Sequence, residues 1–231
     1  MDASAAPILV WFRRDLRVGD NPALAAAASS GRPIVPVFIL DDETPGLRAP
    51  GGASRWWLHG ALAALAADLD AAGSRLILRR GAADRVLDEL IAETGATAVH
   101  WDRLYDAGGI SRDTEIKSSL KDRGIAAESF NGSLLFEPWE IETKAGSWFK
   151  VYTRFWQACR AAGDPPPPID TPRAMPAPGA WPECDDLEAW ALLPQAPDWA
   201  AGFRDHWTPG AAGASDSAEA SASASARQST R

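Results

Sequence analysis

Five apolar runs recur along the first 130 residues, and a stretch with helical periodicity separates each run from the next. The runs are Ile8–Phe12, Ile34–Leu40, Arg75–Arg79, Thr97–Asp102 and Ile125–Phe130. Strands that are apolar throughout have to be covered on both faces, and strands that alternate with helices pair in parallel. The pattern therefore predicts an α/β fold: a doubly wound, five-stranded parallel sheet of the Rossmann-like type, with helices on both faces.

Local signals mark the ends of the four intervening helices. The predicted helices run from Pro22 to Gly31, from a Ser54 cap to Gly73, up to Gly95, and from near Ser111 to Gly124. Before Pro22, a side-chain oxygen in Asp20-Asn21 is expected to cap the helix, and a proline is well tolerated in a first turn because its missing N–H costs nothing there. The adjacent Trp56 and Trp57 point about 100° apart on a helix, so we expect one in the core and the other on the surface.

After Phe130 the alternation stops. We divide the chain into an α/β domain (1–130), a loop plus helix that completes it (131–163), a proline-rich linker with an apolar patch (164–207) and a low-complexity tail (208–231). The helix is predicted over Phe149–Ala162, with Val151, Phe155 and Ala158 on its buried side. The tail is rich in alanine and serine and has nothing to bury, so we expect it to be disordered.

Composition narrows the possible functions. The net charge is -8, with 23 basic and 31 acidic residues, and this balance disfavours direct DNA binding, which rests on neutralising phosphates. Cys159 and Cys184 have no metal-ligand spacing, and nothing indicates an oxidising compartment. The first residues lack the basic and apolar parts of a signal peptide, and no run is long enough to span a membrane. We therefore expect a cytoplasmic protein without a membrane partner.

Polar residues follow three of the predicted strands at the edge where an open parallel sheet binds ligands. They are Arg13, Arg14 and Asp15 after the first strand, Asp41 and Asp42 after the second, and Asp102, Arg103, Tyr105 and Asp106 around the end of the fourth. Because ligands bind where the strand order reverses, this set predicts a small-molecule crevice, although solvated loops alone would also carry polar groups. No G-x-G-x-x-G or phosphate-binding loop is present, and the three histidines are too scattered for a metal or nucleophile site.

Several segments resemble the DNA photolyase/cryptochrome family, specifically its N-terminal antenna domain. They are WFRRDLRVGDNPAL (11–24), SRWWLHGALAALAADL (54–69), GSRLILRRG (73–81), AVHWDRLYD (98–106), RDTEIK (112–117), FNGSLLFEPWEI (130–141), KVYTRFWQAC (150–159) and WTPG (207–210). The resemblance covers roughly residues 7 to 207. Asp102 stands where the family often has asparagine, and Arg154 stands where related segments have proline.

The resemblance implies a light-harvesting role. In this family the α/β domain often holds an antenna chromophore, a folate or a deazaflavin and less often a flavin. The antenna passes energy to FAD in a C-terminal helical domain, which repairs pyrimidine dimers in DNA. Matching the family's antenna contacts position by position implies Arg14, Phe38, Asp41, Arg55 and Asp106 as chromophore-binding residues. The family's FAD and DNA contacts are expected beyond the matched part, so we expect this chain alone to bind an antenna at most and to perform no repair.

Two other readings stay open. The chain is also consistent with an interaction module that docks a separate flavin domain or self-associates, because Trp57 or Trp56, Trp190 and Trp199 are expected to be exposed. It is also consistent with the remnant of a cryptochrome-type photoreceptor. A generic nucleotide-binding protein is disfavoured by the missing glycine fingerprints.

Overall fold

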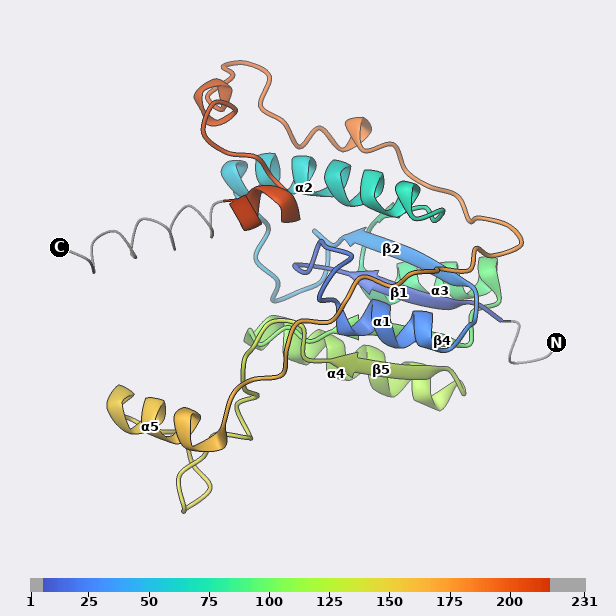
Figure 1. The fold of residues 1–231 in the computed structure, drawn as a ribbon. Coiled ribbons are helices and arrows are strands. Elements are labelled where there is room, and N and C mark those ends of the chain that lie inside the picture. Colours follow the sequence, from blue (N-terminus) through green and yellow to red (C-terminus); the bar gives the residue numbers. More distant parts are fainter. Residues whose placement is uncertain (1–5, 217–231) are drawn as a thin grey trace.

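The computed structural model describes residues 6–216, in which five parallel strands form one sheet (Figure 1). The strands are β1 (Ile8–Phe12), β2 (Ile34–Leu40), β3 (Ile77–Arg80), β4 (Ala98–Asp102) and β5 (Ala126–Phe130). Their order is β3-β2-β1-β4-β5, so the chain first builds outward from β1 on one side and then returns to build on the other. This arrangement confirms the predicted doubly wound fold and places the reversal of strand order between β1 and β4.

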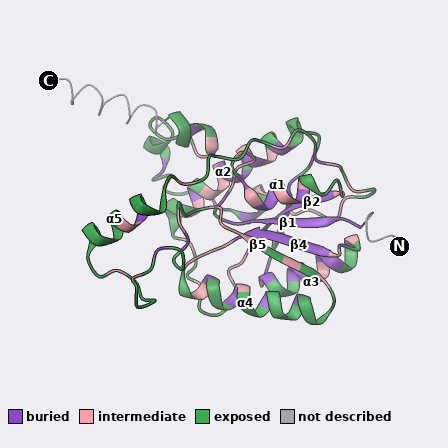
Figure 2. Ribbon diagram, turned by 60° about the horizontal axis from the view of Figure 1, so that its bottom comes forward, coloured by how far each residue is buried: buried purple, intermediate pink, exposed green. Residues whose placement is uncertain are grey.

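Four helices cover the two faces of the sheet: α1 (Pro22–Ser29), α2 (Gly52–Ala71), α3 (Ala83–Thr94) and α4 (Ala107–Asp122). Successive side chains of a strand point to opposite faces, so Ile8 and Phe12 pack with α1 and α2, whereas Leu9 and Trp11 pack with α3 and α4. Every residue of β1 and β2 is buried, as the purple strands of Figure 2 show. The continuous apolar runs in the sequence reflect this burial on both faces.

The helix boundaries agree with the sequence signals at some ends and not at others. The side chain of Asn21 caps α1 by accepting a hydrogen bond from the Leu24 amide at 2.9 Å. The predicted Ser54 cap is wrong, because α2 begins at Gly52 after an extended Gly51 that makes no side-chain cap. The predicted start of α4 near Ser111 is also wrong.

Helix α4 begins one turn earlier than predicted, at Ala107, because Asp106 caps it by accepting a hydrogen bond from the Gly109 amide at 2.9 Å. Glycine lowers helix propensity, which hid this first turn in the sequence. The structure needs glycine there, since a Cβ atom on Gly109 would lie 2.8 Å from the Cβ of Leu104.

Residues 131–163 leave the sheet and end in α5 (Tyr152–Ala162), which projects from the body of the domain (Figure 1). The predicted buried side of this helix is wrong, because Val151 is 58% exposed and Phe155 is 40% exposed. Cys159 is the buried residue of α5. The helix also begins at Tyr152 and not at the predicted Phe149. The surface that would cover its apolar face is not supplied by the described residues.

The segment 164–207 is mostly extended and returns along the α/β domain, passing α1 and then α2 (Figure 1). It contains two short 3₁₀ turns, η1 (Glu188–Trp190) and η2 (Ala201–Phe203). The amide of Ile34 donates to the carbonyl of Pro176 at 2.8 Å, and Trp190 is buried against Phe38. The expectation that Trp190 is exposed is therefore wrong, since it belongs to the core.

The end of the described chain lies against α2. Residues 211–216 are helical, and a Cβ atom on Gly210 would lie 2.9 Å from the Cβ of Ala64. The prediction of a disordered tail over 208–231 is therefore wrong for residues 211–216, and residues 217–231 fall outside the described residues. Within residues 6–216 no helix combines the length and apolar character needed to cross a membrane.

Candidate functional site

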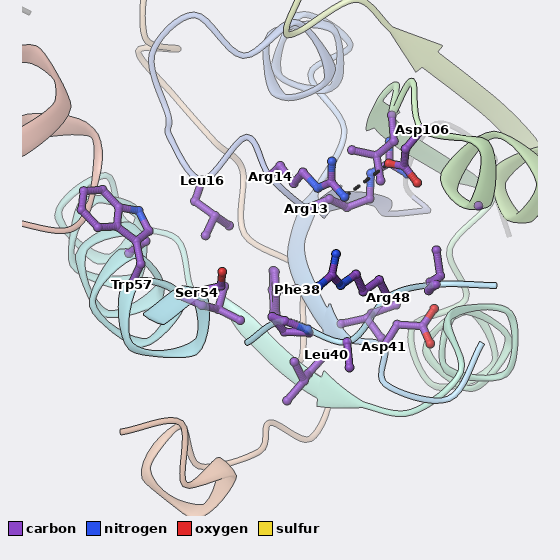
Figure 3. A pocket seen from close by; sticks show the side chains of 18 of the residues that line it. Arg13, Arg14, Leu16, Phe38, Leu40, Asp41, Arg48, Ser54, Trp57 and Asp106 are labelled. Atoms are coloured by element: carbon purple, nitrogen blue, oxygen red, sulfur yellow. Dashed lines mark ion pairs between the residues drawn. The ribbon is translucent and has the colours of Figure 1, made fainter. Parts of the chain in front are cut away.

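A cavity of about 1180 Å³ opens at the carboxyl ends of the strands (Figure 3). Its walls come from the loops that follow β1, β2 and β4, from the first turns of α2 and α4, and from residues 210–214. The loops after β1 and β4 meet where the strand order reverses, which is where open α/β sheets bind their ligands. The structure thus places a cavity at the edge of the sheet for which the sequence predicted a crevice.

The lining divides by chemistry into an apolar part and a charged part. The apolar side chains are Trp11, Leu16, Phe38, Ile39, Leu40, Leu47, Trp57, Leu58 and Leu104, together with several alanines and Pro50. The charged side chains are Arg13, Arg14, Arg17, Asp41, Arg48, Asp106 and Arg112. Apolar walls with a few placed polar groups are typical of pockets for flat organic molecules.

Four of the five predicted site residues line this cavity, namely Arg14, Phe38, Asp41 and Asp106. Arg14 and Asp106 form an ion pair at 3.3 Å, and Figure 3 shows this pair at one side of the cavity. Phe38 lies at the end of β2, with most of its surface buried. Arg55 is not among the lining residues. Its guanidinium lies 3.7 Å from Asp42, and its Nε donates to the carbonyl of Pro50 at 3.1 Å.

The Asp41 carboxylate is occupied by protein donors. It accepts hydrogen bonds from the amide and the hydroxyl of Thr44 at 2.9 and 2.7 Å, and it lies 3.3 Å from Arg112. Arg112 is itself buried and also bonds to Asp113 at 2.9 Å. Asp41 therefore holds the loop after β2 and orients Arg112 within the wall.

A buried cluster of charges and one indole forms the deepest part of the wall. Arg13 pairs with Asp113 at 2.5 Å, and the guanidiniums of Arg13 and Arg112 each lie within 5 Å of the Trp11 ring, at 4.8 and 4.7 Å from its centroid. Burial lowers the pKa of the Arg13 guanidinium, although the adjacent Asp113 carboxylate raises it. The charged loop that follows β1 is thus tied to α4 by packing as well as by ion pairs.

Two buried carboxyl groups meet beside the cavity, at the reversal point itself. Asp102 ends β4 and Asp15 lies in the loop after β1, and both are at least nine-tenths buried. One oxygen of Asp102 accepts from the Ala23 amide at 3.2 Å, whereas its Oδ2 has no protein donor. Burial, followed by the charge of Asp15 and a hydrogen bond with it, raises the pKa of Asp102 to about 8. We infer that Asp102 keeps its proton at neutral pH beside the carboxyl group of Asp15.

Sequence reasoning missed several wall residues: Leu47, Arg48, Trp57 and the terminal residues Gly210, Ala211 and Ala214. Residues 43–51 show only turn signals in the sequence, so nothing there marked Arg48 as a cavity residue. RDTEIK (112–117) resembles a family segment, but that resemblance carried no role for Arg112. The contribution of residues 210–214 depends on the long return of the chain, which no local pattern predicts.

Comparison with known proteins identifies a common origin for most of the chain. Residues 8–176 match the family model described as DNA photolyase. The deoxyribodipyrimidine photo-lyase of Agrobacterium fabrum is 47% identical over 216 residues, which cover 94% of this chain and 44% of that protein. Cryptochrome-2 of Arabidopsis thaliana is 47% identical over 153 residues, which cover 65% of this chain and 25% of the cryptochrome.

Solved structures agree with this result. The crystal structure of a bacterial class III photolyase from Agrobacterium tumefaciens superposes with a TM-score of 0.87 at 47% identity, over 92% of this chain and 43% of that one. A photolyase from Sulfolobus tokodaii, described with two FAD molecules, shares the fold with a TM-score of 0.63 at 21% identity, over 80% of this chain and 41% of that one. The chain spans less than half the length of these relatives.

Proposed function

Because the chain belongs to the DNA photolyase family, we propose that its α/β domain binds a light-absorbing antenna chromophore in the cavity at the carboxyl edge of the sheet. The observation that carries this proposal is the cavity of about 1180 Å³ at the reversal point, lined by four of the five residues that the family resemblance implies. A folate or a deazaflavin is the proposed class of ligand, with a flavin as the third choice. FAD of the family's catalytic domain is not proposed to bind these residues.

The walls suit a flat ring with polar edges. Phe38 and the aliphatic side chains around it provide an apolar surface for the ring face. Asp106 has one oxygen committed to the cap of α4, while the other faces Arg14, so both side chains can exchange that contact for a ring N–H and a ring carbonyl. In this proposal Phe38, Arg14 and Asp106 contact the chromophore, whereas Asp41 and Arg55 hold the surrounding loop.

Titration with a folate and with a deazaflavin tests the proposal, using ligand fluorescence as the readout. Ser54 lines the cavity from the exposed first turn of α2, so Ser54→Trp should fill part of the cavity without disturbing the core. Ala53 is also exposed but does not line the cavity, which makes Ala53→Trp the matched control. We expect Ser54→Trp to weaken binding by about tenfold or more, and Ala53→Trp to leave it unchanged.

Failure of the folded wild-type protein to bind any of the three chromophores would refute the proposal. Circular dichroism establishes folding in each sample. If Ser54→Trp and Ala53→Trp bound equally well, the chromophore would have to bind elsewhere on the domain.

The family resemblance implies light-driven repair of pyrimidine dimers as the activity of the whole family fold. For this chain we propose light harvesting without repair. The support is that the described cavity lies in the α/β domain, which is the part of the family fold that this chain matches. Repair of thymine dimers by this purified chain with FAD under blue light would contradict this division of roles.

Exposed aromatic side chains in residues 131–163 favour a second candidate function, an interaction module. The large exposed side chains there include Trp139, Trp148, Tyr152, Phe155 and Trp156. Several large exposed apolar side chains in one segment favour an interface. We propose that it docks the helical flavin-binding part of the family fold.

Light scattering over a range of concentrations, with and without a separately expressed flavin domain, tests this second candidate. Trp156→Ser should weaken the complex with the flavin domain. Ile110→Ser, which removes an equally exposed apolar side chain from α4, should leave the complex unchanged. Self-association that Trp156→Ser abolishes would instead identify a second copy as the occupant, and a monomer with no affinity for the flavin domain would exclude the module.

A further inference from the structure

The side chains that line the cavity are more basic than the protein as a whole. Its lining contains five arginines and two aspartates, whereas the chain as a whole has a net charge of -8. The carboxylate of Asp113, just behind the lining, neutralises part of the buried charge of Arg13 and Arg112. Asp20 likewise lies 3.7 Å from Arg17, and Asp15 acts on Arg13 through its charge. Among the described residues, Arg48 is therefore the lining arginine without an ion pair.

Two of these arginines are available to a ligand. Arg48 is exposed at the cavity, and no carboxylate among the described residues pairs with it. Arg14 is also exposed, with a single ion pair to Asp106 at 3.3 Å. The two come from different loops, the one after β2 and the one after β1, and Figure 3 shows both among the side chains around the cavity.

The buried guanidinium of Arg13 has two nitrogen atoms without hydrogen-bond partners. The Nε and Nη2 atoms of Arg13 are buried and make no hydrogen bond within the described part of the chain. The carboxylates of Asp113 and Asp15 balance its charge. The exposed guanidiniums of Arg14 and Arg48 therefore supply the attraction for an anionic ligand.

We propose that Arg14 and Arg48 form an oxyanion-binding subsite of the cavity, which selects a chromophore that carries a phosphate or carboxylate tail over the same ring without one. This inference rests on the proposed chromophore site and adds the charge class of its ligand. A guanidinium binds phosphate and carboxylate oxygens through two parallel hydrogen bonds, and such charge-assisted bonds are stronger than those between neutral groups. The apolar wall around Phe38 holds the ring, and the arginines hold the tail at the open side.

FMN and riboflavin make a matched pair of probes, because they share one ring and differ by a phosphate. We expect FMN to bind the wild-type protein at least about tenfold more tightly than riboflavin at low ionic strength, and the preference to shrink as salt is added. Arg48→Gln should reduce the preference several-fold without changing riboflavin affinity, whereas Arg48→Lys should retain much of it. Arg75→Gln, at an exposed arginine before β3 that does not line the cavity, controls for the loss of one charge and should keep the full preference.

The outcomes separate this inference from the function on which it rests. Equal binding of FMN and riboflavin, or a preference that survives in both Arg14→Gln and Arg48→Gln, would overturn the oxyanion subsite and leave chromophore binding intact. Absence of binding by both flavins to the folded protein would overturn the oxyanion subsite, and absence of binding by a folate and a deazaflavin as well would overturn both. Displacement of FMN by inorganic phosphate or by acetate supports the subsite, and the stronger competitor identifies the tail.

Discussion

Asp102→Asn is expected to remove a loss of folding stability that the wild-type domain shows as the pH rises. The native protein keeps a proton on Asp102 up to a pKa of about 8, whereas the unfolded carboxyl releases it near its ordinary value of 3.8. Between these values the native state binds more protons than the unfolded state, so the free energy of unfolding falls as the pH rises. An asparagine amide stays neutral at every pH, and its oxygen can accept from the Ala23 amide as Asp102 does at 3.2 Å.

The size of the effect follows from the proton count. One proton taken up or released corresponds to about 1.4 kcal/mol for each pH unit. From pH 5 to pH 7 the wild-type protein should therefore lose about 3 kcal/mol of stability relative to Asp102→Asn. This value is an upper limit, because movement of the neighbouring loop at Gly132 would let water reach the ionised carboxylates of Asp102 and Asp15.

Urea unfolding followed by circular dichroism at pH 5, 6 and 7 measures the difference. Asp122→Asn is the control, since Asp122 is exposed at the end of α4 and its loss should change stability by a constant amount over this range. A wild-type stability that stays level relative to Asp102→Asn from pH 5 to pH 7 would refute the retained proton. A wild-type stability that rises relative to the variant over this range would refute it as well.

Three further substitutions test the packing around the site. Trp190→Ala should cost about 3–5 kcal/mol in urea unfolding because it leaves a cavity in the core, and a cost below about 1 kcal/mol would mean that the return segment is not part of the cooperative unit. Asp113→Ala should cost a similar amount, since it leaves Arg13 buried without its partner, and full retention of stability would show that water reaches the guanidinium. Gly132→Ala should lower the midpoint of thermal unfolding, because its Cβ would clash with the Asp102 carboxyl, and an unchanged midpoint would contradict that close approach.

The fold could be predicted from the sequence because its signals are local. A buried parallel strand leaves a continuous apolar run, and a helix leaves a 3.6-residue period, so β1 and β2 have the predicted bounds. The edge of the sheet that holds the cavity followed from strand order, since polar residues after β1, β2 and β4 meet there. Asp106 was assigned to that edge, although its second role as the cap of α4 was missed.

Features made by distant parts of the chain could not be predicted in the same way. Trp190 packs on Phe38, although the two residues lie about 150 positions apart in the sequence. No local pattern distinguishes such a tryptophan from an exposed one. The reverse error occurred in α5, where an amphipathic period predicted a buried face that the described residues leave open. Arg48 was missed because turn residues carry no periodicity that would indicate which way a side chain points.

Residues 210–214 form a part of the cavity wall that has no large side chains. Gly210, Ala211 and Ala214 line it with little more than backbone and methyl groups, while other parts of the wall include Trp11, Phe38 and Ile39, which are buried in the core. The width of the cavity at this wall therefore depends on the position of the backbone over residues 210–216 and not on the rotamer of a large side chain. The placement of this short helix against α2 thus sets one dimension of the ligand site.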